Sequence, residues 1–219
     1  MSESTVRVQP GEAIEPHLRA GATVVLAPGV HMGGFAIECS LTLRGEPGAV
    51  LDAHRSGPVL RVDQDGLSVS VEGLTLRGGA GEAGGGLLLT GWSEVALHNV
   101  CLEDNEATLS KGGIGGGAYL FRGVLTAEDC TFRDNRAGGG NDLAVGGSAR
   151  CFVRGGFFAG DVACREGAEL TITGAHITGR LVLRGSTTRA PQVSLKGARI
   201  DGGVVNDVNL PATVSVEDG

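Results

Sequence analysis

A short motif occurs twice in this sequence, about 30 residues apart, and such a repeat limits the chain to a few architectures. The segment Asn99–Ala107 aligns with Glu128–Ala137. Glycine clusters at 84–86, 115–117 and 146–147 recur with a similar interval. A period of roughly 20 to 50 residues is typical of solenoids, in which a single turn cannot bury its own apolar face. The sequence therefore predicts stacked turns.

The elements expected within each turn are short β-strands. Apolar residues alternate with polar ones in runs such as Leu67–Val71, and a period of two indicates strands. No segment has the length of the crossover helix that parallel strands in an open sheet usually need. Hairpins in a sandwich and turns of a solenoid both remain, and the repeats favour the solenoid. Successive turns are expected to begin near Leu41, Leu67, Glu94, Gly123, Ala149 and Ala168.

Two regions of the sequence resemble known β-helix families. Ile14–Val30 resembles the opening of pectate-lyase-like right-handed parallel β-helices, where a short capping helix precedes a glycine, an apolar strand and a Pro-Gly turn. Phe132–Asn135 is similar to the Phe-x-x-Asn signature of polymorphic outer-membrane protein repeats, and Leu102–Asn105 matches it with Leu in place of Phe. The resemblance implies an all-β fold, a single-stranded right-handed parallel β-helix. It implies no particular activity, because this scaffold carries lyases, hydrolases, adhesins and inert stalks.

The resemblance also sets the expected boundaries. A single domain is expected over residues 1–219, with coils over about 21–216 and a short N-terminal capping helix within about 12–20. Ile14 and Leu18 have i, i+4 spacing, so a helix there would turn both side chains toward the barrel. Pro16 limits that helix to one or two turns.

Inside the barrel, equivalent residues of neighbouring turns are expected to stack about 4.8 Å apart. Asn105 would then lie over Asn135, with their amides bonding each other and the turn backbone. Cys101 would lie over Cys130 in a small core ladder, within the distance of a disulfide. The five cysteines form no CxxC pair, so we expect reduced core thiols and no metal site.

Charge and composition argue against several classes of partner. The net charge is −7 and only two residues are lysine, which argues against nucleic acid and anionic membranes. No apolar run approaches the roughly 18 residues of a membrane span. The first residues lack the pattern of a secretory signal, so a cytoplasmic location is expected. No cofactor is expected either.

Few residues are candidates for catalysis. Asp52 and His54 lie two apart on an expected strand and share a face, which would suit general acid–base chemistry. Asp104 and Asp134 are expected at one turn of neighbouring coils, as an acid–base pair or part of a calcium site. In both cases the alternative is an acid that closes a turn. The resemblance implies calcium and a basic residue in lyases, or aspartates with Gly-His-Gly in polygalacturonases, and the sequence has no Gly-His-Gly.

The lone tryptophan, Trp92, is expected in a turn, either exposed as a contact for a sugar or a protein or folded over the barrel edge. Taken together, the sequence favours a non-enzymatic module that binds another protein, as a scaffold, inhibitor or immunity-type protein. A carbohydrate-binding or carbohydrate-active β-helix is the alternative, implied by the family alone. A calcium-stabilised exoprotein is the third interpretation.

Overall fold

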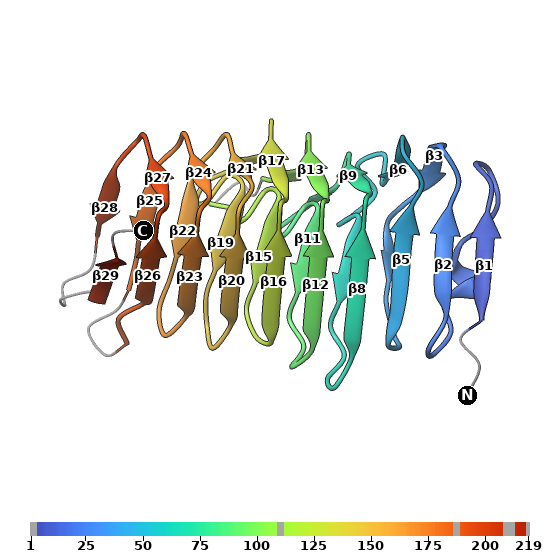
Figure 1. Ribbon diagram of the computed structural model, residues 1–219, viewed down its shortest axis with the longest axis horizontal. Coiled ribbons are helices and arrows are strands. Elements are labelled where there is room, and N and C mark those ends of the chain that lie inside the picture. The colour runs from blue at the N-terminus through green and yellow to red at the C-terminus, as the bar shows by residue number, and fades with distance from the viewer. Residues whose placement is uncertain (1–3, 109–111, 186–188, 208–212, 218–219) are drawn as a thin grey trace.

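The chain forms a right-handed parallel β-helix with three long sheets along its axis (Figure 1). The computed structural model describes residues 4–108, 112–185, 189–207 and 213–217. Within these residues every strand pairing is parallel, and strands pair with their equivalents on the neighbouring turns. The expected fold class is confirmed.

Each turn contributes one strand to each of the three sheets, here called A, B and C, which together enclose the core. Sheet A has ten strands: β1 (Thr5–Val8), β2 (Thr23–Leu26), β5 (Leu41–Gly45), β8 (Ser68–Glu72), β12 (Glu94–His98), β16 (Val124–Glu128), β20 (Arg150–Arg154), β23 (Glu169–Thr173), β26 (Gln192–Lys196) and β29 (Thr213–Glu217). Sheet B has eight: β3 (Gly29–Met32), β6 (Ala49–Asp52), β9 (Thr75–Arg77), β13 (Cys101–Glu103), β17 (Thr131–Arg133), β21 (Phe157–Phe158), β24 (His176–Ile177) and β27 (Arg199–Ile200). Sheet C has eight: β4 (Phe35–Ala36), β7 (Leu60–Val62), β11 (Leu87–Leu89), β15 (Ala118–Leu120), β19 (Leu143–Val145), β22 (Val162–Cys164), β25 (Leu181–Leu183) and β28 (Val204–Asn206). Three short strands, β10 (Ala80–Gly81), β14 (Glu106–Ala107) and β18 (Arg136–Ala137), form a fourth sheet between B and C.

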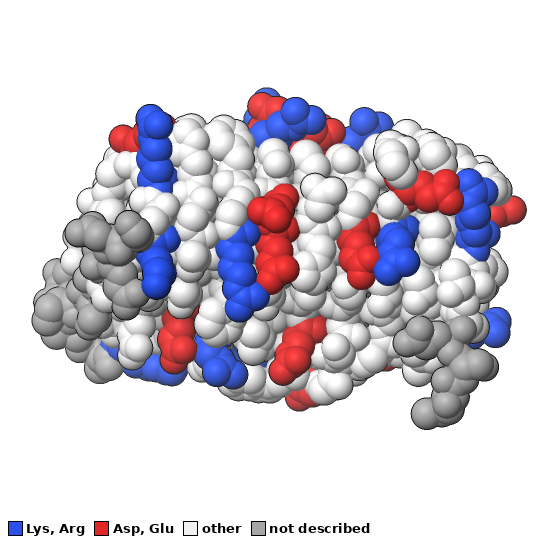
Figure 2. Space-filling view, viewed as in Figure 1, with Lys and Arg blue, Asp and Glu red and all other residues white. Residues whose placement is uncertain are grey.

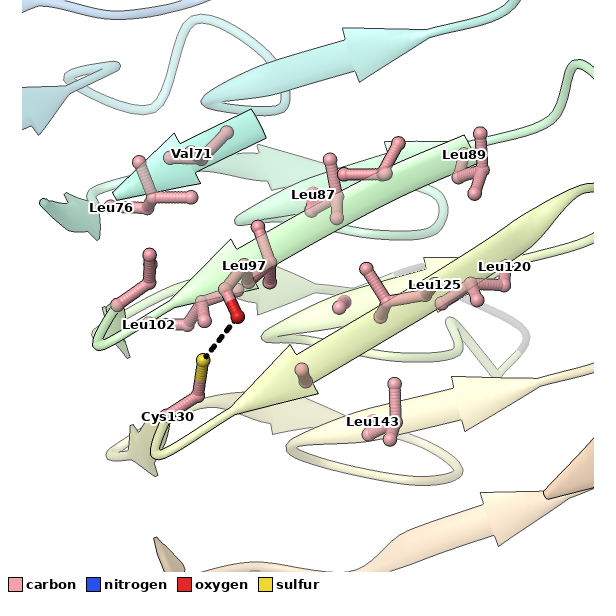
Figure 3. Packing of buried hydrophobic residues seen from close by; sticks show 14 of the residues in the cluster. Val71, Leu76, Leu87, Leu89, Leu97, Leu102, Leu120, Leu125, Cys130 and Leu143 are labelled. Atoms are coloured by element: carbon pink, nitrogen blue, oxygen red, sulfur yellow. Dashed lines mark hydrogen bonds between the residues drawn. The ribbon is translucent and has the colours of Figure 1, made fainter. Parts of the chain in front are cut away.

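The core is a column of aliphatic side chains inside the barrel. Alternate residues of each sheet A strand point inward, which is why Val71 of β8 and Leu97 of β12 are both buried. These two residues are paired in register, as are Leu76 and Leu102 in sheet B (Figure 3). Stacking of like residues on successive turns therefore builds one continuous core.

The outer face of sheet A is polar and flat. Its charged residues form ion pairs between neighbouring strands, such as Arg44 with Glu72 at 2.7 Å and Arg154 with Glu128 at 2.6 Å. Figure 2 shows these pairs as adjoining red and blue side chains, with uncharged surface beside them. The middle outward position on these strands is mostly threonine or serine, as in Thr42.

Left-handed residues form the corners at both ends of the sheet B strands. Asn99 and Asp129 precede β13 and β17 with φ of 52° and 50°, and Asp104 and Asp134 follow them with φ of 51° and 56°. Asn and Asp adopt this conformation more readily than other residues that carry a side chain. Both candidate aspartates are therefore turn-forming residues.

The N-terminal cap differs from the expected helix. A single 3₁₀ turn, Glu15–His17, lies where the helix was expected, and β1 pairs with β2 to extend sheet A at this end. Pro16 has no N–H to donate, and only the i→i+3 bonds from His17 to Ile14 and from Leu18 to Glu15 form. Ile14 is nevertheless buried against the core, so the segment still covers the end of the barrel.

The expected cysteine ladder is also wrong. Cys101 pairs with Thr131 and not with Cys130, because the second repeat has one more residue between its cysteine and its asparagine. A shift of one residue moves a side chain to the other face of a strand. Cys130 is buried, with Sγ 3.5 Å from the Leu97 carbonyl oxygen (Figure 3), whereas Cys101 is half-buried on the outer side. All five cysteines are free.

Candidate functional site

Asp52 and His54 meet at the end of β6, where they close a turn. One carboxylate oxygen of Asp52 accepts a hydrogen bond from the His54 backbone N–H at 2.9 Å, and the other accepts one from Arg77 Nε at 2.8 Å. Burial alone would raise the pKa of Asp52, but these hydrogen bonds and the Arg77 charge lower it below its usual value. The carboxylate is thus held ionised by internal partners.

Asp104 and Asp134 occupy equivalent positions on adjacent turns, and both are exposed. An oxygen of Asp104 accepts a hydrogen bond from Arg55 Nη2 at 2.6 Å. No group of three or more His, Cys, Asp and Glu residues in the described part of the chain is arranged to hold a metal ion.

Asn105 and Asn135 form part of a buried polar ladder. Asn105 Nδ2 donates to Asn135 Oδ1 at 3.1 Å and to the Leu76 carbonyl at 2.9 Å. Asn135 Nδ2 in turn donates to Asp142 Oδ1 at 3.0 Å, and the Gly160 N–H donates to Asp142 Oδ2 at 2.5 Å. Burial raises the pKa of Asp142, although these two hydrogen bonds oppose the shift. The ladder is structural, and sequence reasoning missed its third member, Asp142.

Trp92 lies in the turn between β11 and β12, and 53% of its surface is exposed. Its backbone N–H donates to Asp65 Oδ1 at 2.7 Å, which fixes the turn and leaves the ring in solvent.

A larger hollow, about 410 Å³, lies between the N-terminal segment and β3. Its lining includes Glu12, Glu15, Met32 and His54. Glu12 is already occupied by the backbone N–H of Gln9, at 2.6 Å.

The outer face of sheet C is the part of the surface that departs most from the alternating pattern. In β19, β22 and β25 every residue is buried, outward-facing ones included. The outward residues of successive strands form a column that we call the sheet C ladder: Leu88, Tyr119, Ala144, Ala163, Val182 and Val205. Ala144, Ala163 and Val182 pack with Ile114 from a preceding loop. Sheet C therefore carries a small second apolar cluster outside the barrel.

A groove of about 360 Å³ lies beside this ladder, and we call it the sheet C groove. It is lined by Ile114, Tyr119, Phe121, Gly146, Gly147, Arg165, Glu166 and Arg189. Its volume falls in the range of ligand-binding pockets, about 300–1,000 Å³.

The groove exists because of one glycine. Phe121, Gly146 and Arg165 each follow a sheet C strand, at equivalent positions on three successive turns. Gly146 has no side chain to fill the space between the ring of Phe121 and the stem of Arg165. A Cβ at Gly146 would meet the Tyr119 hydroxyl at 3.5 Å and Arg165 Cβ at 3.6 Å, which are ordinary contacts. A larger side chain there would fill the groove without straining the backbone.

The walls of the groove are aromatic and cationic. Phe121 is 41% exposed, and the Arg122 guanidinium carbon lies 5.4 Å from its ring centre. Burial raises the pKa of Tyr119, so its hydroxyl is neutral at physiological pH. Among the described residues, neither Arg165 nor Arg189 has an ion-pair partner, and Glu166 is the single acid in the lining.

Comparison with known proteins offers no guide to this site. No protein-family model, curated protein or solved structure matches the chain. The described residues include no helix long and apolar enough to cross a membrane.

Sequence reasoning did not find the groove. Its residues are scattered from Ile114 to Arg189, and the lengths of the turns bring them together. One signal was available: Leu143–Val145, Val162–Cys164 and Leu181–Leu183 are apolar at every position. Strands of this kind are covered on both faces, which could have drawn attention to sheet C.

Proposed function

We propose that this protein is a non-enzymatic binding module that engages another protein through the sheet C groove. The observation that carries the proposal is the grouping of Tyr119 and Phe121 with two unpaired arginines, Arg165 and Arg189, around one hollow. Tyrosine and arginine are enriched among the residues that dominate the energy of protein interfaces. A cluster of these residues without internal partners favours an external one.

The candidate catalytic residues also support binding in preference to chemistry. Asp52 is engaged by Arg77 and the His54 backbone, and Asp104 is bonded to Arg55. Asp134 is an exposed turn residue in the left-handed conformation. A general acid near neutral pH needs a raised pKa, whereas the pKa of Asp52 is lowered.

Kinship with the pectate-lyase-like superfamily and a cytoplasmic location belong to the same proposal. The parallel sheets and the covered N-terminal opening support the kinship. A partner inside the cell would fit a scaffold, inhibitor or immunity-type role.

A photo-crosslinking experiment tests the proposal. Phe121 is replaced with benzoylphenylalanine, and the protein is irradiated in a lysate of its source cells. The same replacement at Phe152, an outward aromatic residue of sheet A, is the matched control. We expect one polypeptide adduct from position 121 that is absent from position 152 and lost when Gly146→Leu fills the groove.

Equal adducts from both positions, or adducts that persist with Gly146→Leu, would rule out the groove as the binding site. Attachment to a glycan in place of a polypeptide would favour the carbohydrate-binding alternative.

A further inference from the structure

We infer that the occupant of the sheet C groove is an acidic, extended peptide segment of a protein partner. A carboxylate of this segment would pair with Arg165 or Arg189, and a neighbouring apolar side chain would pack on Tyr119 and Phe121. This inference rests on the proposed function and specifies the chemistry of the partner.

The first argument is local charge. The chain as a whole carries a net charge of −7, yet the groove is cationic. Arg165 and Arg189 face one acid, Glu166, and Arg122 adds a further positive charge beside Phe121. Elsewhere on sheet C the arginines are matched within the chain: Arg180 lies 2.6 Å from Asp161, and Arg184 lies 3.5 Å from Asp207. The groove is where arginines are left for an external anion.

The second argument is that glycines seat the arginines close to the backbone. A Cβ on Gly167 would come within 2.9 Å of the Arg189 guanidinium carbon. A Cβ on Gly139 would lie 3.2 Å from Arg184 Nη1 and 3.8 Å from Arg165 Nη1. The guanidinium groups thus lie over bare backbone, where their planar donors can meet a carboxylate in a two-pronged arrangement.

The third argument concerns how a peptide could be held. β15, β19 and β22 are each paired with a strand on both sides, so a peptide cannot join sheet C as an added strand. Recognition must come from side chains. The sheet C ladder offers an apolar floor to an aliphatic or aromatic side chain, and the arginines at its border offer charge. An extended acidic segment with an apolar residue satisfies both.

The test uses a displayed library of random peptides, about 12 residues long, selected against the full chain. Affinities of the enriched peptides are measured by fluorescence anisotropy for the wild type and for the double variant Arg165→Glu with Arg189→Glu. Arg150→Glu is the matched control, since Arg150 is an exposed arginine of sheet A with the same change of charge. Arg165→Gln with Arg189→Gln serves as a milder pair should the double reversal fail to fold.

We expect enriched peptides to combine Asp or Glu with Leu, Phe or another apolar residue, and to lose binding to the Gly146→Leu variant. The double reversal should weaken binding about ten-fold or more, because like charges then face each other. Arg150→Glu should change affinity by no more than about two-fold. Raised salt should reduce the difference between the wild type and the variants.

Two outcomes would overturn the inference, and they are distinguishable. Groove-dependent peptides that are neutral or basic, or that ignore the double reversal, would refute the acidic partner and leave the binding module intact. Absence of any groove-dependent peptide, with or without binding of uronate oligosaccharides, would refute the protein-binding function itself.

Discussion

At the scale of single residues, polar side chains inside the barrel stabilise the turns. Asn135 is buried and uses both ends of its amide, with Oδ1 accepting from the Asn105 backbone N–H and Nδ2 donating to the Leu102 carbonyl and to Asp142. The neighbouring Asp134 is exposed, and its carboxylate is not needed for the turn. These adjacent residues therefore have different effects on stability.

We expect Asn135→Ala to lower the free energy of unfolding by about 2–4 kcal/mol, because several buried donors and acceptors lose their partner. Asp134→Asn keeps a residue type suited to the left-handed turn and should change stability by no more than about 0.5 kcal/mol. Urea unfolding of the two variants measures both values. Similar losses for the two would show that the turn, and not the ladder, carries the stability.

The thiols should be unreactive in the folded protein. Burial raises the pKa of Cys101 and Cys130 to about 11 and that of Cys164 to about 12. At such a pKa only about a thousandth of the thiol is ionised near pH 8. We expect Ellman's reagent to label the native protein about a hundred-fold more slowly than free cysteine, and unfolding to release all five thiols. Rapid labelling of native Cys101 would contradict this.

At the scale of elements, the inward and outward positions of one short strand have distinct roles. In β21, Phe158 points into the core and stacks on Phe132 with ring centres 4.5 Å apart. Phe157, next to it, points outward and meets His176 edge-on at 5.5 Å. The same residue type thus serves two faces within two positions.

Phe158→Ala should cost about 3–5 kcal/mol of stability through the cavity it leaves between the turns. Phe157→Ala should cost about 1 kcal/mol, since its ring is partly in solvent. Chemical denaturation of both variants provides the comparison. Equal costs would mean that the outward aromatic contact matters as much as the core.

The buried ladder should also give the fold a specific pH dependence. The folded-state pKa of Asp142 lies above that of the unfolded chain, so this residue stabilises the fold most at low pH and less as pH rises through the folded pKa. Asp142→Asn removes this titration. We expect the stability advantage of the wild type over the variant to shrink between about pH 4 and pH 7. An advantage that grows with pH in urea unfolding would show that the fold favours the anion.

Local patterns were enough to predict the strands but not their register. The expected turn starts at Leu67 and Glu94 agree with β8 and β12 to within one residue, because alternation is read within each strand. The pairing of Cys101 depends on how many residues the corner contains, which no strand pattern records. The capping helix was wrong for a related reason: Ile14 and Leu18 have helical spacing, but the local backbone forms a 3₁₀ turn.

At the scale of the whole molecule, each turn contacts its immediate neighbours, and stability is distributed along the stack. The candidate site shares this property, because it spans successive turns of sheet C. Its residues could not be grouped from the sequence, since Phe121, Gly146 and Arg165 become neighbours only when the length of each turn is known.

A complete turn should therefore be removable. Ser68 pairs with Glu94, and the Glu94 N–H bonds the Leu67 carbonyl at 2.8 Å, so deletion of residues 68–93 joins points that already lie together. We expect this variant to keep a β-rich circular dichroism spectrum and a cooperative but lower melting transition. Deletion of 68–80 removes about half a turn and should abolish folding. Equal behaviour of the two deletions would contradict nearest-neighbour stacking.

The regular strand spacing makes the molecule a vernier. Equivalent positions recur about every 4.8 Å along the axis, whereas side chains on one face of an extended peptide recur about every 6.7 Å. The two periods coincide after three turns and two peptide repeats, at about 14 Å. Phe121 and Arg184 are three turns apart. A peptide lying along the axis would therefore be in step with the protein at these two residues, which fixes the spacing of the side chains that it must present.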